Sequence, residues 1–405
     1  MSFREQFEIP AKYKMWSMIL MAVGLVSILI GYFLYGAGDE HQNARFWGVL
    51  LYNSVYFLLV VNAAMFFICA TTLAMGGWQL SFRRVSEAIS VAVIPIGIIS
   101  FVILIALVLG HQHHIYHWLT PGDDKLILGK KAFLNPTFFI VWTVLTIAGW
   151  ILLGARMRKI SAELDERGPL TKEEGKRYVY KTTVWGSLYL VWFALTVAST
   201  VPWLWFMSID AHWYSTMYSW YTFASSFVAG IALMTLFVIY LKNHGYLELV
   251  NQEHLHDLGK FMFAFSIFWT YLWFSQFMLI WYANIPEETV YFKHRVQGPY
   301  RGIFFLNLII NFLAPLLILM RRSSKRNYTL LVFMSVLILF GHWIDFYQMV
   351  IGSISKDHVE LNLFDFGVAA GFIGLIMWSA GNALTKRSLV VKNHPFLKES
   401  IIHHT

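Results

Sequence analysis

Ten blocks of about 20 apolar residues follow one another along the chain, separated by short polar segments. A helix of about 20 residues crosses the roughly 30 Å hydrocarbon layer of a bilayer. Lipid offers the backbone no hydrogen-bond partner, so each block has to pair its own amide groups as a helix, which excludes strands. The blocks cover about 13–34, 47–73, 89–109, 137–153, 184–207, 218–241, 261–281, 303–319, 330–350 and 363–384. The sequence therefore predicts an all-α polytopic membrane protein, with residues 1–405 in a single integral membrane domain.

Composition agrees with this class. Charged residues make up 13% of the chain and hydrophobic residues 58%, and the charged fraction is about half that of soluble domains. The first block is longer than the apolar region of a signal peptide and no Ala-x-Ala cleavage pattern follows it, so we expect it to remain as a span. The single cysteine, Cys69, excludes disulfides within the chain, cysteine-ligated iron–sulfur clusters and covalent c-type haem.

The distribution of basic residues predicts the orientation. With ten spans, the two termini and the loops after even-numbered spans lie on one side, and this side holds 23 of the 31 Lys and Arg residues. Such a bias places both termini in the cytoplasm. It also explains most of the net charge of +8 without a nucleic-acid partner. The longest basic segment, 156–181, is interleaved with Asp and Glu and is typical of a solvated amphipathic hairpin.

Ionisable side chains inside spans are costly to bury, and they indicate candidate pathways or binding sites. The clearest case is Gly-His-Trp-Ile-Asp-Phe-Tyr, residues 341–347, where His342 and Asp345 share one helix face. A buried His and carboxylate in this arrangement can exchange a proton with a quinol hydroxyl or pass it along a relay. The alternative is a structural hydrogen-bonded pair that locks two helices together.

Other polar side chains are expected in the same outer half of the membrane. Gln276 is expected there and Asp365 enters the last span there, whereas Tyr271 lies deeper in span 7; Gln276 and Tyr271 are candidate hydrogen-bond donors. Asp210 and His212, between spans 5 and 6, are candidates for a proton exit. Asparagine and serine side chains in these spans have helix–helix hydrogen bonding as their ordinary role.

Metal and haem sites are not expected. The stretch from His111 to His117 is rich in histidine, but its spacing matches no standard zinc pattern, and a wet interfacial loop is the preferred interpretation. A b-type haem needs two histidines that face each other from within helices, and only His342 lies well inside a span. We therefore expect no redox metal held by this chain.

Ten spans with cytoplasmic ends, the segment Phe3 to Trp16 and the segment His342 to Tyr347 resemble the NrfD-like, polysulfide-reductase-type membrane subunits. Within that family the chain is most similar to the smaller quinone-subunit-like membrane component of bacterial Alternative Complex III, a quinol:cytochrome c oxidoreductase. The resemblance implies two four-helix bundles, from spans 2–5 and 6–9, with spans 1 and 10 flanking them. It also implies residence in the bacterial inner membrane.

The same resemblance implies partners and cofactors. These partners are a homologous larger quinone subunit, an iron–sulfur protein, a multihaem cytochrome c and in some organisms a terminal oxidase, so that haem and iron–sulfur centres belong to other subunits. No cofactor is bound covalently, and menaquinone or ubiquinone is the implied ligand. The expected role is quinone binding, proton translocation, or both, at His342 and Asp345. A secondary transporter with a mid-membrane site and a purely structural membrane anchor remain alternatives.

Overall fold

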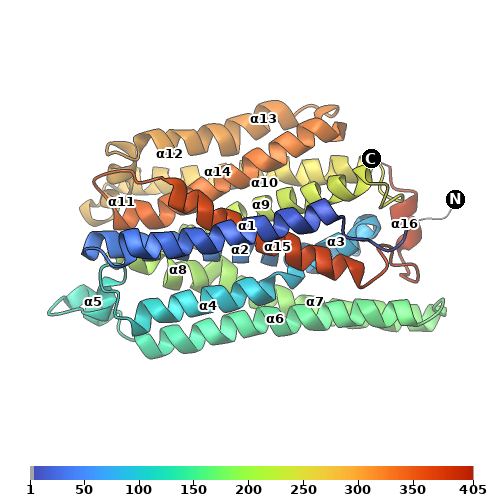
Figure 1. Ribbon diagram of the computed structural model, residues 1–405, viewed down its shortest axis with the longest axis horizontal. Helices are drawn as coiled ribbons and strands as arrows, with labels where there is room; N and C mark the ends of the chain where they lie inside the picture. Colours follow the sequence, from blue (N-terminus) through green and yellow to red (C-terminus); the bar gives the residue numbers. More distant parts are fainter. Residues whose placement is uncertain (1–3, 405) are drawn as a thin grey trace.

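The computed structural model describes residues 4–404 as helices joined by short turns and loops (Figure 1). Within this range, the extended pairing is an isolated bridge between Gln6 and Ser388. The described residues contain ten helical segments that are long and apolar enough to cross a membrane, which confirms the predicted all-α polytopic class. Both termini lie at one end of the molecule, called here the terminal end (Figure 1). The short helices α5 (Lys125–Gly129) and α11 (Pro286–Val296) lie at the opposite end, called the far end.

Several of the ten spans consist of more than one helical segment. In chain order they are α1 (Ala11–Gly31) with the π-helical turn η1 (Tyr32–Gly36); α2 (Glu40–Leu73); α3 (Arg83–Val91) with α4 (Val93–Leu109); α6 (Pro136–Glu166); α7 (Lys172–Leu195) with η4 (Thr196–Thr200) and α8 (Val201–Trp205); α9 (Met217–Asn243); α10 (Gln252–Ala283); α12 (Arg301–Leu308) with η6 (Ile309–Leu313) and α13 (Ala314–Leu319); α14 (Tyr328–Ile354); and α15 (Leu363–Thr385). Short 3₁₀ turns occupy Trp78–Ser81, His117–Leu119, Met207–Asp210 and Ser324–Arg326, and α16 (Leu397–Ile401) ends the chain.

Several helices extend beyond their apolar blocks. α6 and α7 continue past the predicted spans 137–153 and 184–207 into the segment 156–181, where they form a helical hairpin at the terminal end. Thr171 starts α7 with a capping box to Glu174, which satisfies free amide groups of the first turn. An ion pair of 2.7 Å between Lys181 Nζ and Glu163 joins the two helices. The predicted amphipathic hairpin is therefore helical almost to its tip.

Two π-helical turns each stand directly before a proline-containing helix. η4 precedes Pro202 in α8, and η6 precedes Pro315 in α13. Proline lacks the amide hydrogen that would continue the regular hydrogen-bond ladder, and a π-turn accommodates the local change of register. Spans 5 and 8 thus each contain a π-helical turn next to a proline.

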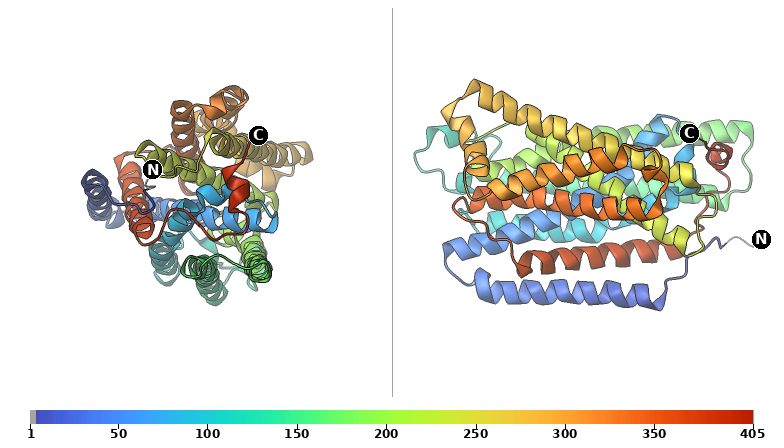
Figure 2. Two further views of the ribbon diagram at one scale, coloured as in Figure 1. Left: turned by 90° about the vertical axis from the view of Figure 1, so that its right-hand side faces the viewer. Right: turned by 90° about the horizontal axis from the view of Figure 1, so that it is seen from above.

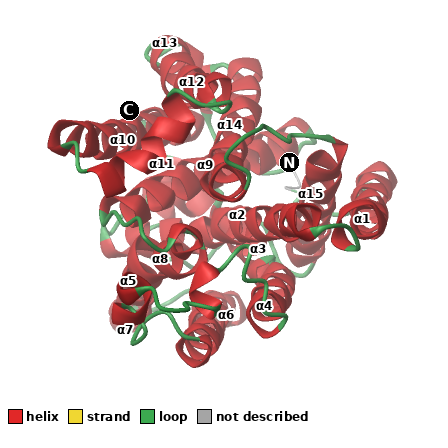
Figure 3. Cartoon of the chain, turned by 90° about the vertical axis from the view of Figure 1, so that its left-hand side faces the viewer, coloured by secondary structure: helices red, strands yellow, loops and turns green. Residues whose placement is uncertain are grey.

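The spans form two four-helix bundles, as the family resemblance implies. α2, α3–α4, α6 and α7 pack in a ring, and α9, α10, α12–α13 and α14 pack in a second ring (Figure 3). α2 and α9 contact each other across the boundary, and α14 also packs on α2. α2 is therefore the central helix, and most of its residues are buried. α15 covers α2 and α3, and α1 packs on α15 at the edge of the molecule (Figure 2).

The outside of the molecule is apolar where the spans face away from the bundles. Phe33, Leu152 and Leu317 are exposed by 60% or more of their surface, and many other large apolar side chains are exposed on the same helices. Water would make such a surface unfavourable, whereas hydrocarbon would not. The exposed belt and the buried polar interior together are typical of a multi-pass membrane protein.

Candidate functional site

The histidine and aspartate singled out in the sequence lie on the buried face of α14. His342 is 0% exposed and Asp345 is 1% exposed. Because residues three apart share a helix face, both side chains point from α14 toward α9 and α10 of the same bundle. Gly341 permits η6 to approach α14 closely, since a Cβ atom at this position would lie 2.1 Å from Asn311 Oδ1 in η6.

One serine joins the two groups. Ser225 Oγ, on α9, lies 2.9 Å from His342 Nδ1 and donates a hydrogen bond of 3.0 Å to Asp345 Oδ2. The direct separation between His342 Nδ1 and Asp345 Oδ2 is 4.0 Å, which is too long for a hydrogen bond. The hydroxyl of Ser225 is therefore the bridge between the imidazole and the carboxyl group.

Two further donors fix the carboxyl group of Asp345. Trp269 Nε1, on α10, donates to Asp345 Oδ2 at 3.1 Å, and the hydroxyl of Tyr221, on α9, donates to Oδ1. The Trp269 ring also meets the His342 ring edge to face at 5.3 Å between centroids. Two helices thus supply three donors to one acceptor group, which matches the acceptor-only inventory of a carboxylate.

The count of protons in this cluster defines the state of the imidazole. A serine hydroxyl carries one proton, and Ser225 directs it to Asp345. His342 Nδ1 must then be the donor in its contact with Ser225. In a neutral imidazole this leaves Nε2 without a proton, and within residues 4–404 this buried nitrogen has no hydrogen-bond partner. The cluster therefore presents a free basic nitrogen at one end and a hydrogen-bonded carboxyl group at the other.

A small cavity continues from Asp345 toward the far end. Its volume is about 10 Å³, and its lining includes Asp345, Gln276, Gln348 and Arg295. About 10 to 15 Å³ is the space that one water molecule occupies by this measure. Gln276 Nε2 and Gln348 Nε2 are buried and have no protein partner within the described chain, so a water in this cavity has polar groups to bind. A quinone ring does not fit in this space.

Arg295 closes the far side of the cavity. Its guanidinium lies 3.5 Å from the centroid of the Tyr291 ring, and Nη2 donates to Gln348 O and Ser353 Oγ at 3.0 Å each. The side chain is 3% exposed although α11 lies outside the spans. Burial raises the pKa of Tyr291 to about 12, so this phenol stays neutral beneath the guanidinium. A fixed positive charge thus stands between the cavity and the far end.

On the opposite side of His342 the buried face of α14 is almost entirely apolar. Toward the terminal end it presents Leu331, Met334 and Ile338, together with Ser335, whose hydroxyl contacts the sulfur of Met262. On α14 itself, the polar groups suited to proton transfer therefore lie from His342 toward the far end. The arrangement is a polar half-path.

Asp365 belongs to a different group. It accepts a hydrogen bond of 2.8 Å from Tyr52, forms an ion pair with Arg45 Nη2, and caps the first turn of α15. Arg45 Nε also pairs with Glu360 at 3.0 Å. Each oxygen of this buried carboxyl group has a fixed partner, and the structure does not bring Asp365 into contact with His342 or Asp345. Its contacts are those of a structural ion pair between α2 and α15.

The remaining candidates are also separate from the cluster. Asp210 pairs with Lys356 at 2.9 Å, and His212 Nε2 lies 2.5 Å from Asp124 Oδ2, both at the far end. The hydrogen bond from His212 lowers the pKa of Asp124. Tyr271 is 62% exposed and points away from the bundle interior. Of the sequence candidates, His342, Asp345 and Gln276 are brought together, whereas Tyr271, Asp365, Asp210 and His212 are not.

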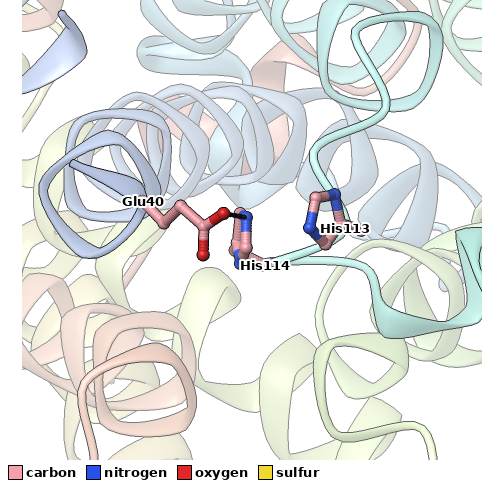
Figure 4. A group of neighbouring side chains, drawn as sticks. All are labelled: Glu40, His113 and His114. Atoms are coloured by element: carbon pink, nitrogen blue, oxygen red, sulfur yellow. Dashed lines mark ion pairs between the residues drawn. The ribbon is translucent and has the colours of Figure 1, made fainter. Parts of the chain in front are cut away.

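Two groups at the far end have side chains that can act as metal ligands. Glu40, His113 and His114 lie together, with His114 Nε2 3.4 Å from Glu40 Oε1 (Figure 4). His41, His358 and Glu360 form the second group, with 3.3 Å between the two imidazole Nε2 atoms. Glu40, His41 and His113 are exposed, and the groups are also explained by hydrogen bonds and ion pairs among their members. The His111 to His117 loop thus contributes two histidines to one such group.

Sequence reasoning missed three residues of the site. Tyr221 stands four residues before Ser225 on α9, and this spacing on one face was the available indication. Trp269 lies in an aromatic, apolar run that carries no sign of its hydrogen bond to Asp345. Arg295 lies between two spans, and its burial follows from the packing of α11 against α14, which the sequence does not reveal.

Comparisons with known proteins add no assignment. No protein-family model matches the chain, and no curated protein matches it.

Proposed function

We propose that the chain is a proton-handling membrane subunit of a bacterial respiratory quinol:cytochrome c oxidoreductase of the Alternative Complex III type. The observation that carries the proton-handling part is the buried link from His342 through Ser225 to Asp345, which ends at a water-sized cavity. The assignment to this complex rests on the sequence resemblance. The positive charge of the terminal end supports cytoplasmic termini in the inner membrane.

The chemistry assigned to the cluster is a proton relay. A proton that reaches His342 Nε2 makes the imidazole cationic, and Nδ1 then gives its proton to Ser225 Oγ. Ser225 passes its own proton to Asp345 Oδ2 in the same event, and the carboxylic acid releases a proton to water in the cavity. One proton enters at Nε2 and one leaves at the far end. The return of the imidazole to its first tautomer resets the cluster.

Proton transfer is favoured over quinone binding by the size of the site. A quinone headgroup needs a cavity in the range of roughly 300 Å³ or more. The space beside Asp345 is about 10 Å³. We accordingly propose that quinol oxidation takes place on the homologous larger subunit, with the iron–sulfur protein and multihaem cytochrome c docked at the far end.

The test is to purify the whole complex carrying Asp345→Asn or His342→Gln and to measure quinol turnover and proton release in proteoliposomes. We expect assembled complex with proton release reduced about tenfold or more. The control is Asp123→Asn, which removes an exposed carboxylate of the far-end loop. Full proton release in the Asp345→Asn complex contradicts the proposal. Loss of assembly in both variants, with normal proton release from the assembled fraction, assigns the cluster a structural role instead.

The assignment to a respiratory complex has its own test. Mild-detergent purification from the native membrane, followed by mass spectrometry and a haem spectrum, is expected to yield multihaem cytochrome c and iron–sulfur partners. A lone, colourless protein contradicts this part of the proposal and favours a secondary transporter.

A further inference from the structure

A lateral cavity near the terminal end is separate from the proton path. Its volume is about 400 Å³, and it lies between the start of span 3, α6 and the end of α15. Pockets of roughly 300 to 1,000 Å³ are the usual size for a bound small molecule. Arg84, Glu87, Arg158, Lys386 and Arg387 lie at its polar end.

The charges at this polar end do not balance. Glu87 is already held by Arg83 at 3.1 Å and Arg84 at 2.5 Å, and Arg84 also pairs with Asp165. Within residues 4–404, Arg158, Lys386 and Arg387 have no carboxylate at ion-pair distance. Arg158 Nη1 donates to Ser90 Oγ at 3.0 Å, and Arg387 Nη1 donates to Arg158 O at 3.0 Å. Two of the three unpaired cations are therefore fixed beside each other at the rim.

The other walls of the cavity are apolar. Span 3 contributes Val91, Ile94 and Pro95, and α15 contributes Trp378 and Ala383. Trp378 is 45% exposed, so the cavity borders the surface that faces lipid. Ile98 and Val102 follow Ile94 at four-residue intervals on α4 and are 56% and 59% exposed. An apolar strip thus leads from the cavity toward the middle of the membrane.

This combination selects an amphiphile with an anionic head. Arg158 lies eight residues before the end of α6, and Lys386 and Arg387 directly follow α15. All three are therefore at the depth of the lipid headgroups, where basic pockets between spans bind anionic lipid. Arginine suits a phosphate because its planar fork of donors matches the phosphate oxygens. We propose that the cavity binds an anionic glycerophospholipid, with its phosphate at Arg158 and Arg387 and an acyl chain along Ile94, Ile98 and Val102.

The binding site is independent of the proton path because it lies near the opposite end of the molecule and in the other bundle. A lipid bound there contacts α4, α6 and α15 at the same time. The bound lipid thereby joins the flanking α15 to the first four-helix bundle.

The first experiment uses the purified full chain, stripped of lipid with detergent and then given defined lipids for native mass spectrometry. We expect phosphatidylglycerol to be retained at least tenfold better than phosphatidylcholine with the same acyl chains. The double variant Arg158→Gln/Arg387→Gln is expected to remove this preference. Lys159→Gln/Lys398→Gln, which changes the same charge at exposed positions outside the cavity, is the matched control and is expected to keep it.

Three outcomes would overturn the proposal. Equal retention of both lipids shows no recognition of the headgroup. An equal loss of preference in the control pair shows general attraction to a basic surface. Displacement of phosphatidylglycerol by millimolar inorganic phosphate indicates a site for a free anion. A second measurement needs no variant: a photoreactive phosphatidylglycerol is expected to label peptides containing Ile94–Ile98 or Trp378, and labelling confined to other spans contradicts the assignment.

Discussion

Ser225 Oγ lies 2.9 Å from His342 Nδ1, so that a hydroxyl on α9 provides the contact through which the imidazole on α14 reaches Asp345. The direct distance of 4.0 Å from Nδ1 to the carboxyl oxygen is too long to replace it. The connection between the imidazole and the carboxyl group therefore depends on this one hydroxyl.

Removal of the Ser225 hydroxyl is expected to interrupt proton transfer while the fold persists. Ser225→Ala leaves a neutral methyl group in the same space, and proton release by the assembled complex should fall about tenfold or more. Ser226→Ala is the matched control, because the neighbouring hydroxyl donates to Phe223 O at 3.0 Å within its own helix. Equal rates for Ser225→Ala, Ser226→Ala and the unaltered complex would show that protons bypass the bridge.

A second prediction concerns the ion pair that the structure assigns to helix packing. Asp365→Asn removes the buried carboxylate that faces Arg45, and breaking a buried pair costs roughly 3 to 5 kcal/mol. We expect about 3 kcal/mol, the lower end, because Glu360 still holds Arg45 Nε. Chemical unfolding in detergent measures this loss, and proton release per assembled complex should not change.

The control for this prediction is Glu173→Gln. It breaks an exposed pair with Lys176 of 3.0 Å, and such pairs contribute about 1 kcal/mol or less. If Asp365→Asn instead abolished proton release without loss of stability, Asp365 would belong to the proton path.

Asp345 and Asp365 show which features of the site the sequence predicts and which it does not. The ten apolar blocks predict the all-α class and the number of spans, and an even number of spans predicts that both termini lie at one end. The helix spacing of His342 and Asp345 also places them on one face correctly. In the sequence Asp365 is an equally good candidate, because it is a carboxylate at the border of a predicted span. What separates it from Asp345 is the distant Arg45, and a single sequence does not show which helices lie next to each other.

The same limit of a single sequence explains why the positions of the Tyr271 and Arg295 side chains were not predicted. Tyr271 follows Trp269 by two residues, which turns its side chain to the opposite side of α10, toward lipid. The rotation of α10 about its axis decides which way the Tyr271 side chain points. The sequence does not predict this rotation, because an aromatic run rich in Trp and Phe has no single apolar face. Arg295 lies in what the sequence presents as a loop, and only the fold carries it into the bundle.

A third prediction follows from His394 in the segment after α15. Burial, followed by the charge of Arg83, lowers the pKa of His394 to about 3, and its ring meets Tyr178 edge to face at 5.3 Å. Its Nδ1 accepts a hydrogen bond from Phe396 N. The other charged groups that act on it are Arg84, which disfavours the cation, and Glu87, which favours it.

Acidic pH is expected to destabilise the fold through this histidine. The unfolded histidine, with a pKa of about 6.5, binds a proton that the folded one does not, so its contribution is present above pH 6.5 and is lost as the pH falls toward 3. We expect the melting temperature to fall by a few degrees between pH 7.5 and 5, with faster hydrogen exchange in residues 386–396. In His394→Gln, which does not titrate, this part of the pH dependence should disappear. A pH dependence identical to that of the unaltered protein would rule out His394 as its source.

The last prediction concerns the crossing of α1 and α15, where two glycines meet. A Cβ atom on Gly371 would lie 2.8 Å from Gly24 Cα, and one on Gly24 would lie 2.3 Å from Gly371 Cα. Small residues allow such close approach of helices in membranes, where packing and not hydrophobicity holds them together. α1 packs mainly on α15 and is otherwise largely exposed, so this crossing is its principal attachment. Gly371→Ala should therefore force the helices apart at a cost of about 1 to 3 kcal/mol.

Gly302→Ala is the control, because no atom lies within 4 Å of a Cβ at that position. Limited proteolysis of the detergent-solubilised protein should release α1 faster in Gly371→Ala than in Gly302→Ala. Equal release would mean that other contacts of α1 determine its attachment.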